Sequence, residues 1–158
     1  MDPLAFFQWC YDTPIGEAIR NSSWLFPVIE AVHLLGFGLV AGSALIVELR
    51  LLGAGLSRQP VAELAASAQP WLLRGVILMF ASGIPLFLSE SIKAYYSFAF
   101  WVKMACLFLA LLYTFTLRQR VTRTNLSIEH PMQAKSLAIM SIILWFGVAW
   151  GGRWIGFS

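Results

Sequence analysis

Charged side chains are scarce in this chain. Asp, Glu, Lys and Arg make up 12% of the 158 residues, whereas 59% are hydrophobic and 15% aromatic. A water-soluble domain carries about 25% charged residues, so a water-soluble protein is excluded and an integral membrane protein is expected. The length allows one compact domain, residues 1–158. The formal net charge is only +3, and no basic patch with interleaved aromatics is present, so nucleic acid is not an expected partner.

Cysteine is equally rare, and the common catalytic motifs are missing. Cys10 and Cys106 are too few for a disulfide framework or a cysteine-based metal motif. The sequence contains no HExxH, CxxCH, nucleophile elbow, P-loop or dinucleotide fingerprint. A soluble-type enzyme is therefore not expected, and no enzymatic activity is assigned. The start, "MDPLAFFQWCYD", lacks the basic region and cleavage site of a signal peptide, so the first span is expected to be retained.

The chain contains several long runs of apolar residues. A helix needs about 20 mostly apolar residues to cross a bilayer, and open strands cannot satisfy their backbone groups in lipid. The fold class expected is therefore all-α, a polytopic membrane four-helix bundle in contact with the lipid bilayer. Its spans are predicted at about 25–52, 71–90, 98–118 and 135–157. Residues 3–20 are too polar to cross, and their aromatic residues beside acidic ones suit a short interfacial segment.

The distribution of Lys and Arg predicts the orientation of the bundle. One side carries seven basic residues, namely Arg50, Arg58, Arg74, Arg118, Arg120, Arg123 and Lys135. The other side carries four, namely Arg20, Lys93, Lys103 and Arg153, among most of the acidic residues. Both termini are accordingly expected outside, in the periplasm of a bacterial inner (plasma) membrane.

Four ionisable residues in the predicted spans define the candidate site: Glu30, His33, Lys103 and Arg153. Such groups cost about 2.5–3.5 kcal/mol each at the bilayer centre and usually face the bundle interior with partners. Counted along the helices, His33 lies about 12 Å, Lys103 about 8 Å and Arg153 about 6 Å below the outer end of its span. The four groups, with Glu90 at the end of the second span, are expected to form one polar layer.

Each of these residues also has a structural interpretation. His33 can be a buried histidine bonded to Glu30 or to a carbonyl group, or it can be a haem ligand, a metal ligand or a proton relay. Lys103 and Arg153 can extend to the interface, or they can pair with an anionic group such as a haem propionate. His130, in the loop before Pro131, is expected to be solvated.

Other features concern helix shape and packing. Pro85 is expected to kink the second span and to widen the bundle at that level. Gly38 with Gly42, and Gly147 with Gly151, are small-xxx-small pairs suited to close helix contacts or to an oligomer.

Glu48 is expected to pair with Arg74 or another base at the inner end. Trp145 is expected to line the interior, and Met79, Met104 and Met140 are possible sixth ligands of a haem.

The run "TPIGEAIRNSSWLFPVIEAVHLLGFGLVAGSALIVELRLLGAG" resembles the opening of an uncharacterised family of small bacterial four-span membrane proteins. "FAFWVKMACLFLALL" and "SIILWFGVAWGGRWIGF" resemble later signatures of the same family, which has Asp where this chain has Glu48. That family is distantly similar to the copper-resistance D proteins and to the HemJ-type protoporphyrinogen oxidases, the latter associated with haem b. The resemblance implicates His33 as a ligand, with Lys103 and Arg153 as polar partners.

Three functions follow as hypotheses. The first is a haem-b-binding redox or electron-transfer module, with His33 as the axial ligand of the iron, Glu30 orienting the ring, and Lys103 and Arg153 holding the propionates. Only one histidine lies within a span, so the sixth ligand would be Met, Lys, water or a group of a neighbouring subunit. The second is a transporter of a small ion or metal that uses Glu30 and His33. The third is a non-catalytic accessory subunit. A homo-oligomer or a larger membrane complex is compatible with all three.

Overall fold

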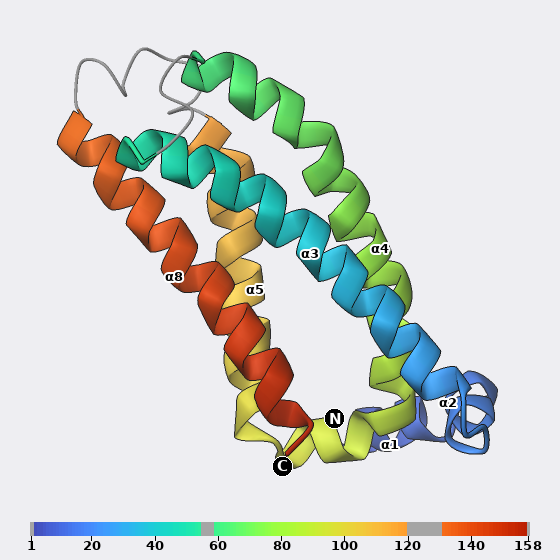
Figure 1. Cartoon of the computed structure of the whole chain (residues 1–158). Coiled ribbons are helices and arrows are strands. Elements are labelled where there is room, and N and C mark those ends of the chain that lie inside the picture. Colours follow the sequence, from blue (N-terminus) through green and yellow to red (C-terminus); the bar gives the residue numbers. More distant parts are fainter. Residues whose placement is uncertain (1, 55–58, 120–130, 158) are drawn as a thin grey trace.

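The computed structural model describes residues 2–54, 59–119 and 131–157, which are almost entirely helical (Figure 1). In chain order its elements are α1 (Pro3–Tyr11), α2 (Pro14–Arg20), α3 (Leu25–Leu52), α4 (Val61–Tyr96), α5 (Phe98–Tyr113), the π-helix η1 (Thr114–Arg118) and α8 (Pro131–Ile155). In this described part, four helical segments are long and apolar enough to cross a membrane: α3, α4, α5 continued by η1, and α8. The predicted all-α membrane bundle is confirmed.

The predicted limits of the first and third spans agree with the structure, whereas those of the second and fourth spans differ. The range 71–90 is the middle of α4, which has 36 residues. The reason is that the polar linker before it is itself helical and continues through Pro70 into the apolar run. The fourth span begins earlier than predicted, at Pro131, where proline costs no helical hydrogen bond.

The long helices form two pairs, in which α3 packs along α4 and α5 packs along α8 (Figure 1). Gly36 of α3 and Gly75 of α4 allow the first close approach, because a Cβ at Gly75 would lie 2.9 Å from the carbonyl oxygen of Gly36. A central apolar cluster joins the two pairs and consists of Val40, Ala44, Leu72, Met79, Ala110, Trp145 and Val148. A second cluster, rich in alanine, lies nearer the C-terminal end of α3.

The two predicted small-xxx-small pairs have different surroundings. A Cβ at Gly147 would meet the Sγ of Cys106 at 2.6 Å, and a Cβ at Gly151 would lie 2.9 Å from the backbone oxygen of Ala99. This pair therefore packs α8 against α5 within one chain. Gly38 and Gly42 have no atom within 4 Å of an added Cβ in the described structure, so that face of α3 is open.

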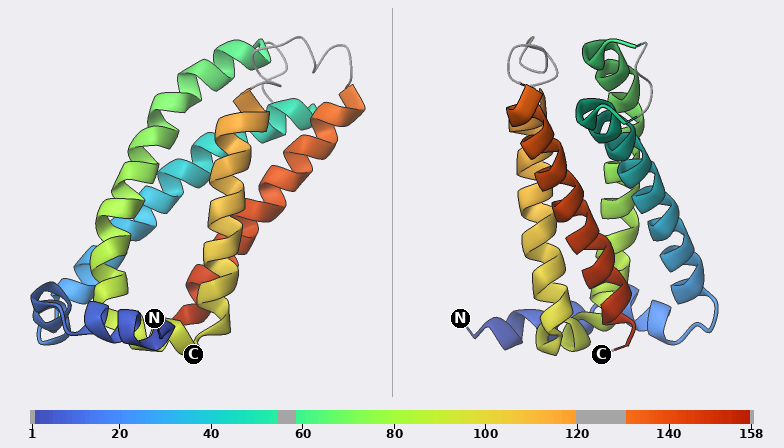
Figure 2. Two further views of the ribbon diagram at one scale, coloured as in Figure 1. Left: turned by 180° about the vertical axis from the view of Figure 1, so that it is seen from behind. Right: turned by 60° about the vertical axis from the view of Figure 1, so that its left-hand side comes forward.

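The break in α4 lies at Glu90 rather than at the predicted position, Pro85. Glu90 has φ −125° and ψ 21°, outside the helical region, whereas the helix continues through Pro85. Arg20 of α2 donates hydrogen bonds to the carbonyl oxygens of Leu88 (3.4 Å) and Ser89 (3.3 Å). These bonds satisfy acceptors that a broken helix leaves without their usual partners. After the break, the last turns of α4 run across the end of the bundle (Figure 2).

The N-terminal helices α1 and α2 lie at this same end, as does the C-terminal end of α8 (Figure 2). Phe7 and Cys10 of α1 and Ile19 of α2 are buried, whereas Phe6 and Trp9 are exposed. The hydroxyl of Ser91 donates to the carbonyl oxygen of Phe7 over 2.9 Å and ties α1 to the end of α4. The sequence predicted a short interfacial segment here, and α1 and α2 form a short helical segment at the end of the bundle.

Candidate functional site

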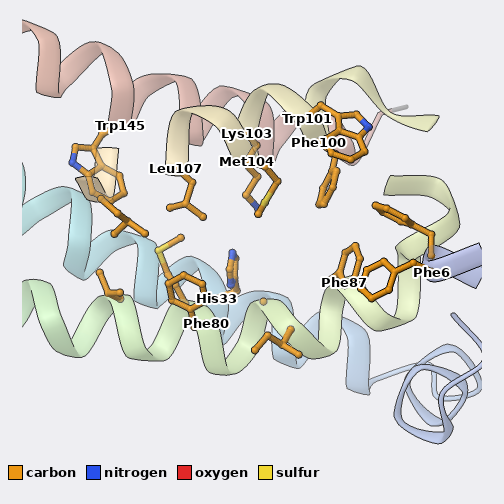
Figure 3. A pocket seen from close by; sticks show the side chains of 16 residues that line it. Phe6, His33, Phe80, Phe87, Phe100, Trp101, Lys103, Met104, Leu107 and Trp145 are labelled. Atoms are coloured by element: carbon orange, nitrogen blue, oxygen red, sulfur yellow. The ribbon is translucent and has the colours of Figure 1, made fainter. Parts of the chain in front are cut away.

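A cavity of about 480 Å³ lies between the two helix pairs. One end is aromatic, with Phe6 and Phe7 of α1, Phe87 of α4, and Phe100 and Trp101 of α5. Trp145 lies at the opposite end, which we call the floor (Figure 3). The walls between the two ends are mostly aliphatic, so the cavity suits a largely apolar ligand. Its two ionisable lining residues in the described structure are His33 and Lys103.

His33 is held in one orientation by α4. Its Nδ1 lies 3.0 Å from the Oγ of Ser82. The hydroxyl of Ser82 donates its one hydrogen to the carbonyl oxygen of Leu78 over 2.6 Å, so towards His33 this oxygen acts as the acceptor. In the neutral ring the proton is therefore on Nδ1, and Nε2 carries the lone pair. One ring nitrogen of His33 points into the cavity, towards the side on which Lys103 lies (Figure 3).

Lys103 approaches the cavity from α5, opposite His33 (Figure 3). Its side chain lies over the glycines of α8. A Cβ at Gly151 would come within 2.8 Å of the Cβ of Lys103, and one at Gly152 would lie 3.7 Å from Nζ. Glycine at position 151 therefore leaves room for the Lys103 stem beside α8, whereas a side chain at position 152 would make an ordinary contact. Lys103 lines the apolar cavity. The sequence predicts His33 and Lys103 at similar depths in the bundle, and in the structure both residues line the same cavity.

Glu30 and Arg153, the other two predicted site residues, do not line the cavity. Glu30 is exposed on α3. The ring nitrogen of His33 that it was expected to orient is bonded to Ser82 instead. Arg153 is exposed near the end of α8, with its guanidinium 4.3 Å from the centre of the Phe157 ring. The reason is that α3 and α8 diverge towards the end where α1 and α2 lie (Figures 1 and 2).

The predicted interior position of Trp145 is confirmed, and two of the three methionines considered as haem ligands lie at the cavity. Met79 and Met104 line the cavity, and Trp145 is buried at its floor. Met140 faces outward, with 52% of its surface exposed. His130 lies outside the described residues.

Ser82 and the aromatic end of the cavity were missed by the sequence reasoning. Ser82 is a buried hydroxyl on an apolar helix, and it is four residues from Leu78, whose carbonyl oxygen it can reach within its own helix. A serine in a span next to Gly83 gave no sign that it would meet α3. The aromatic residues come from α1, α4 and α5, so only their packing brings them together. Phe7 contacts Phe87 and Phe100, with ring centres 5.5 and 6.4 Å away.

Glu48 forms a second polar group, away from the cavity lining. Its carboxylate lies 3.7 Å from a guanidinium nitrogen of Arg118, so its partner is a base other than Arg74. The guanidinium of Arg74 instead lies 4.9 Å from the centre of the Trp71 ring. Among the described residues, no group of three or more His, Cys, Asp or Glu side chains is arranged to hold a metal ion.

Comparison with known proteins gives one match. The model of a family of unknown function, DUF6644, matches residues 6–158. No curated protein and no solved structure matches the chain. The uncharacterised family expected from the sequence is consistent with this match, whereas the similarity to copper-resistance D and HemJ-type proteins stays a prediction.

Proposed function

This chain belongs to the DUF6644 family of unknown function, and we propose that it is a haem-b-binding electron-transfer protein of a bacterial inner membrane. The observation that carries the proposal is the state of His33. Its Nδ1 lies 3.0 Å from the Ser82 hydroxyl, whose hydrogen is donated to the carbonyl oxygen of Leu78, so this hydroxyl accepts from Nδ1 and the basic Nε2 is left for a ligand. Metal-binding histidines are typically fixed in this way through the other ring nitrogen.

The residues that line the cavity fit a haem. Its volume of about 480 Å³ falls within the range of about 300–1,000 Å³ that is usual for cofactor sites. Apolar and aromatic walls suit the flat ring, and the ammonium group of Lys103 suits a propionate. His33 would be the axial ligand, and the thioethers of Met79 and Met104 are available within the same cavity. A bound haem would supply one-electron chemistry at its iron.

The location proposed is the bacterial inner membrane, with both termini outside. The asymmetry of Lys and Arg supports this orientation. The N-terminal helix α1 and the end of α8 lie at one end of the bundle, as an even number of spans requires.

Absorption spectroscopy tests the proposal. The full chain would be purified in detergent, supplied with haem b and freed of excess, and its spectrum recorded before and after reduction by dithionite. We expect a Soret band in the wild type, its loss in His33→Ala, and weaker haem retention in Lys103→Gln. His130→Ala is the matched control, since it removes the other histidine of the chain, and should leave the spectrum unchanged. A wild type without a Soret band, or His33→Ala with the wild-type spectrum, would refute the proposal.

A second candidate function, that of an accessory subunit or homo-oligomer, is favoured by one observation. The Gly38/Gly42 face of α3 has no neighbour within 4 Å of either added Cβ in the described structure. A second helix could approach it closely. Gly42→Leu would then lower the native mass of the protein in mild detergent, whereas an unchanged mass would count against this role.

The transport hypothesis has less support, because it required Glu30 and His33 in one cavity and Glu30 is exposed. Its test is flux of a small ion or metal into liposomes that contain the protein. Under this hypothesis the flux disappears in Glu30→Gln.

A further inference from the structure

A group of buried polar side chains lies beyond the floor of the cavity, between α3, α8 and the α5–η1 segment. It consists of Glu48, Thr114, Arg118, Ser141 and Trp145, which we call the inner polar cluster. Each of these residues is at most 5% exposed, and Glu48 only 1%. Ionisable residues buried within membrane-spanning helices are costly and commonly mark paths for ions or protons.

Hydrogen bonding in this cluster is incomplete. Both carboxylate oxygens of Glu48 lack a hydrogen-bond partner in the described structure, as do the hydroxyls of Thr114 and Ser141 and the indole nitrogen of Trp145. The Glu48–Arg118 separation of 3.7 Å is too long for a hydrogen bond. Ser141 lies close enough to interact with the Glu48 carboxylate, but without hydrogen-bond geometry. A buried ion pair is stabilising only when further hydrogen bonds complete it, so this pair alone does not satisfy Glu48.

Helix geometry places the two α8 residues of the cluster on one face of that helix. Ser141 and Trp145 are four residues apart on α8, about 6 Å along the axis and on one face. The π-helix η1 carries Thr114 and Arg118, both buried, and π-turns recur at functional sites. The indole nitrogen of Trp145 is on the side of the ring turned away from His33 and Lys103 (Figure 3). This indole nitrogen therefore points away from the interior of the cavity, towards the end where the inner polar cluster lies.

The surroundings of Glu48 contain few other titratable groups. Tyr113 of α5 is near enough to interact with Glu48, but its hydroxyl donates to the carbonyl oxygen of Leu137 over 2.6 Å. The neighbouring cluster, to which α4 and α8 contribute small apolar residues, contains Ala65, Ala68, Ala134 and Ala138. Among the described residues, the charged partner that faces Glu48 is thus Arg118 of η1.

We propose that the inner polar cluster is a hydrated proton-binding site, in which Glu48 takes up and releases a proton through water held by Ser141, Thr114 and Trp145. Unsatisfied buried polar groups of this kind are what internal water molecules bind, typically with about three hydrogen bonds each. The inference goes beyond the proposed function and does not depend on haem.

The proton step needs no other reactant. On release, the O–H bond of the Glu48 carboxyl breaks and its proton passes to an adjacent water molecule. The carboxylate that remains is neutralised by Arg118. The hydroxyls of Ser141 and Thr114 can each accept one proton while donating another, so they can pass it along. The indole N–H of Trp145 can only donate, and so it orients water at the floor.

Infrared difference spectroscopy of the purified full-length protein tests this proposal. Spectra would be recorded in H₂O and D₂O over a range of pH, and the carboxyl C=O band followed after rapid mixing with D₂O. We expect a protonated-carboxyl band that exchanges with solvent and is absent in Glu48→Gln. Glu63→Gln is the matched control, because Glu63 is an exposed carboxylate on α4, and it should keep the band.

Ser141→Ala and Thr114→Val probe the water, since both remove a hydroxyl while preserving a small side chain. Each should slow exchange of the Glu48 carboxyl several-fold. These two variants also decide the question if Glu48→Gln does not fold, because they leave the ion pair in place. Absence of an exchangeable carboxyl band at every pH, or an exchange rate unchanged in both hydroxyl variants, would overturn the proposal. Because no haem is added, the result is separate from the test of the proposed function.

Discussion

Replacement of Gly75 by alanine should destabilise the contact between α3 and α4. The new Cβ would lie 2.8 Å from a methyl carbon of Val40, 2.9 Å from the carbonyl oxygen of Gly36 and 2.9 Å from the Cβ of Leu39. A methyl group at the end of a side chain can rotate away, but the Gly36 oxygen and the Leu39 Cβ are fixed to the backbone of α3. The two helices must therefore move apart, by about 0.6 Å if contacts of about 3.5 Å are to be restored.

The size of the expected destabilisation follows from two opposing effects. Overpacking of a close contact typically costs about 1–3 kcal/mol. Alanine in place of glycine within a helix returns about 0.5–1 kcal/mol. The expected net loss in the free energy of unfolding is therefore about 0–2.5 kcal/mol, with a central value of about 1 kcal/mol.

The assay is unfolding of the purified protein in mixed micelles by increasing SDS, followed by circular dichroism. Gly42→Ala is the matched control, because an added Cβ there meets no atom within 4 Å. It should be neutral or stabilising by up to about 1 kcal/mol. The double variant Gly36→Ala/Gly75→Ala should be non-additive, since the two glycines contact each other. If Gly75→Ala and Gly42→Ala had the same effect, the close approach of α3 and α4 would be refuted.

Three further predictions concern single hydrogen-bonding residues. Arg20→Gln removes hydrogen bonds to Ser89 and Tyr11 and should loosen α1 and α2. Cys10 should then react faster with maleimide, because its burial raises the pKa of its thiol and keeps the thiolate fraction low. Equal labelling rates in the variant and the wild type would contradict this. Tyr113→Phe removes the bond to Leu137 and should lower the SDS-unfolding free energy by about 1 kcal/mol, an unchanged midpoint being the contrary result. Ser82→Ala should shift the absorption spectrum of the haem-loaded protein by releasing His33, whereas an identical spectrum would exclude an orienting role for Ser82.

The spans and the position of His33 within one of them could be predicted from the sequence, because both depend on local properties. A run of apolar residues long enough to cross lipid must form a helix to satisfy its own backbone, and α3 has the predicted limits. Depth along a helix also follows from residue count alone. For that reason, His33 and Lys103 were correctly expected at a common level.

The direction in which a side chain points, and its partner, depends on other helices. Glu30 is only three residues from His33, yet it is exposed because α3 and α8 diverge at that end. Glu48 had several possible bases within reach of the inner end. The structure places Arg118 of η1, rather than Arg74, next to its carboxylate. Likewise, the contact between α3 and α4 uses Gly36 and Gly75, which are in different spans and form no motif in the sequence.

The sequence by itself thus determined which segments cross the membrane and which ionisable groups they carry, since hydrophobicity and helix rise are properties of each segment. Tertiary structure decided that His33 bonds to Ser82, that Lys103 faces it across an apolar cavity, and that Glu48 meets Arg118. These pairings depend on how each helix is rotated about its own axis and on the angles at which the helices cross. Both are set by steric fit at a few glycines and by the break at Glu90.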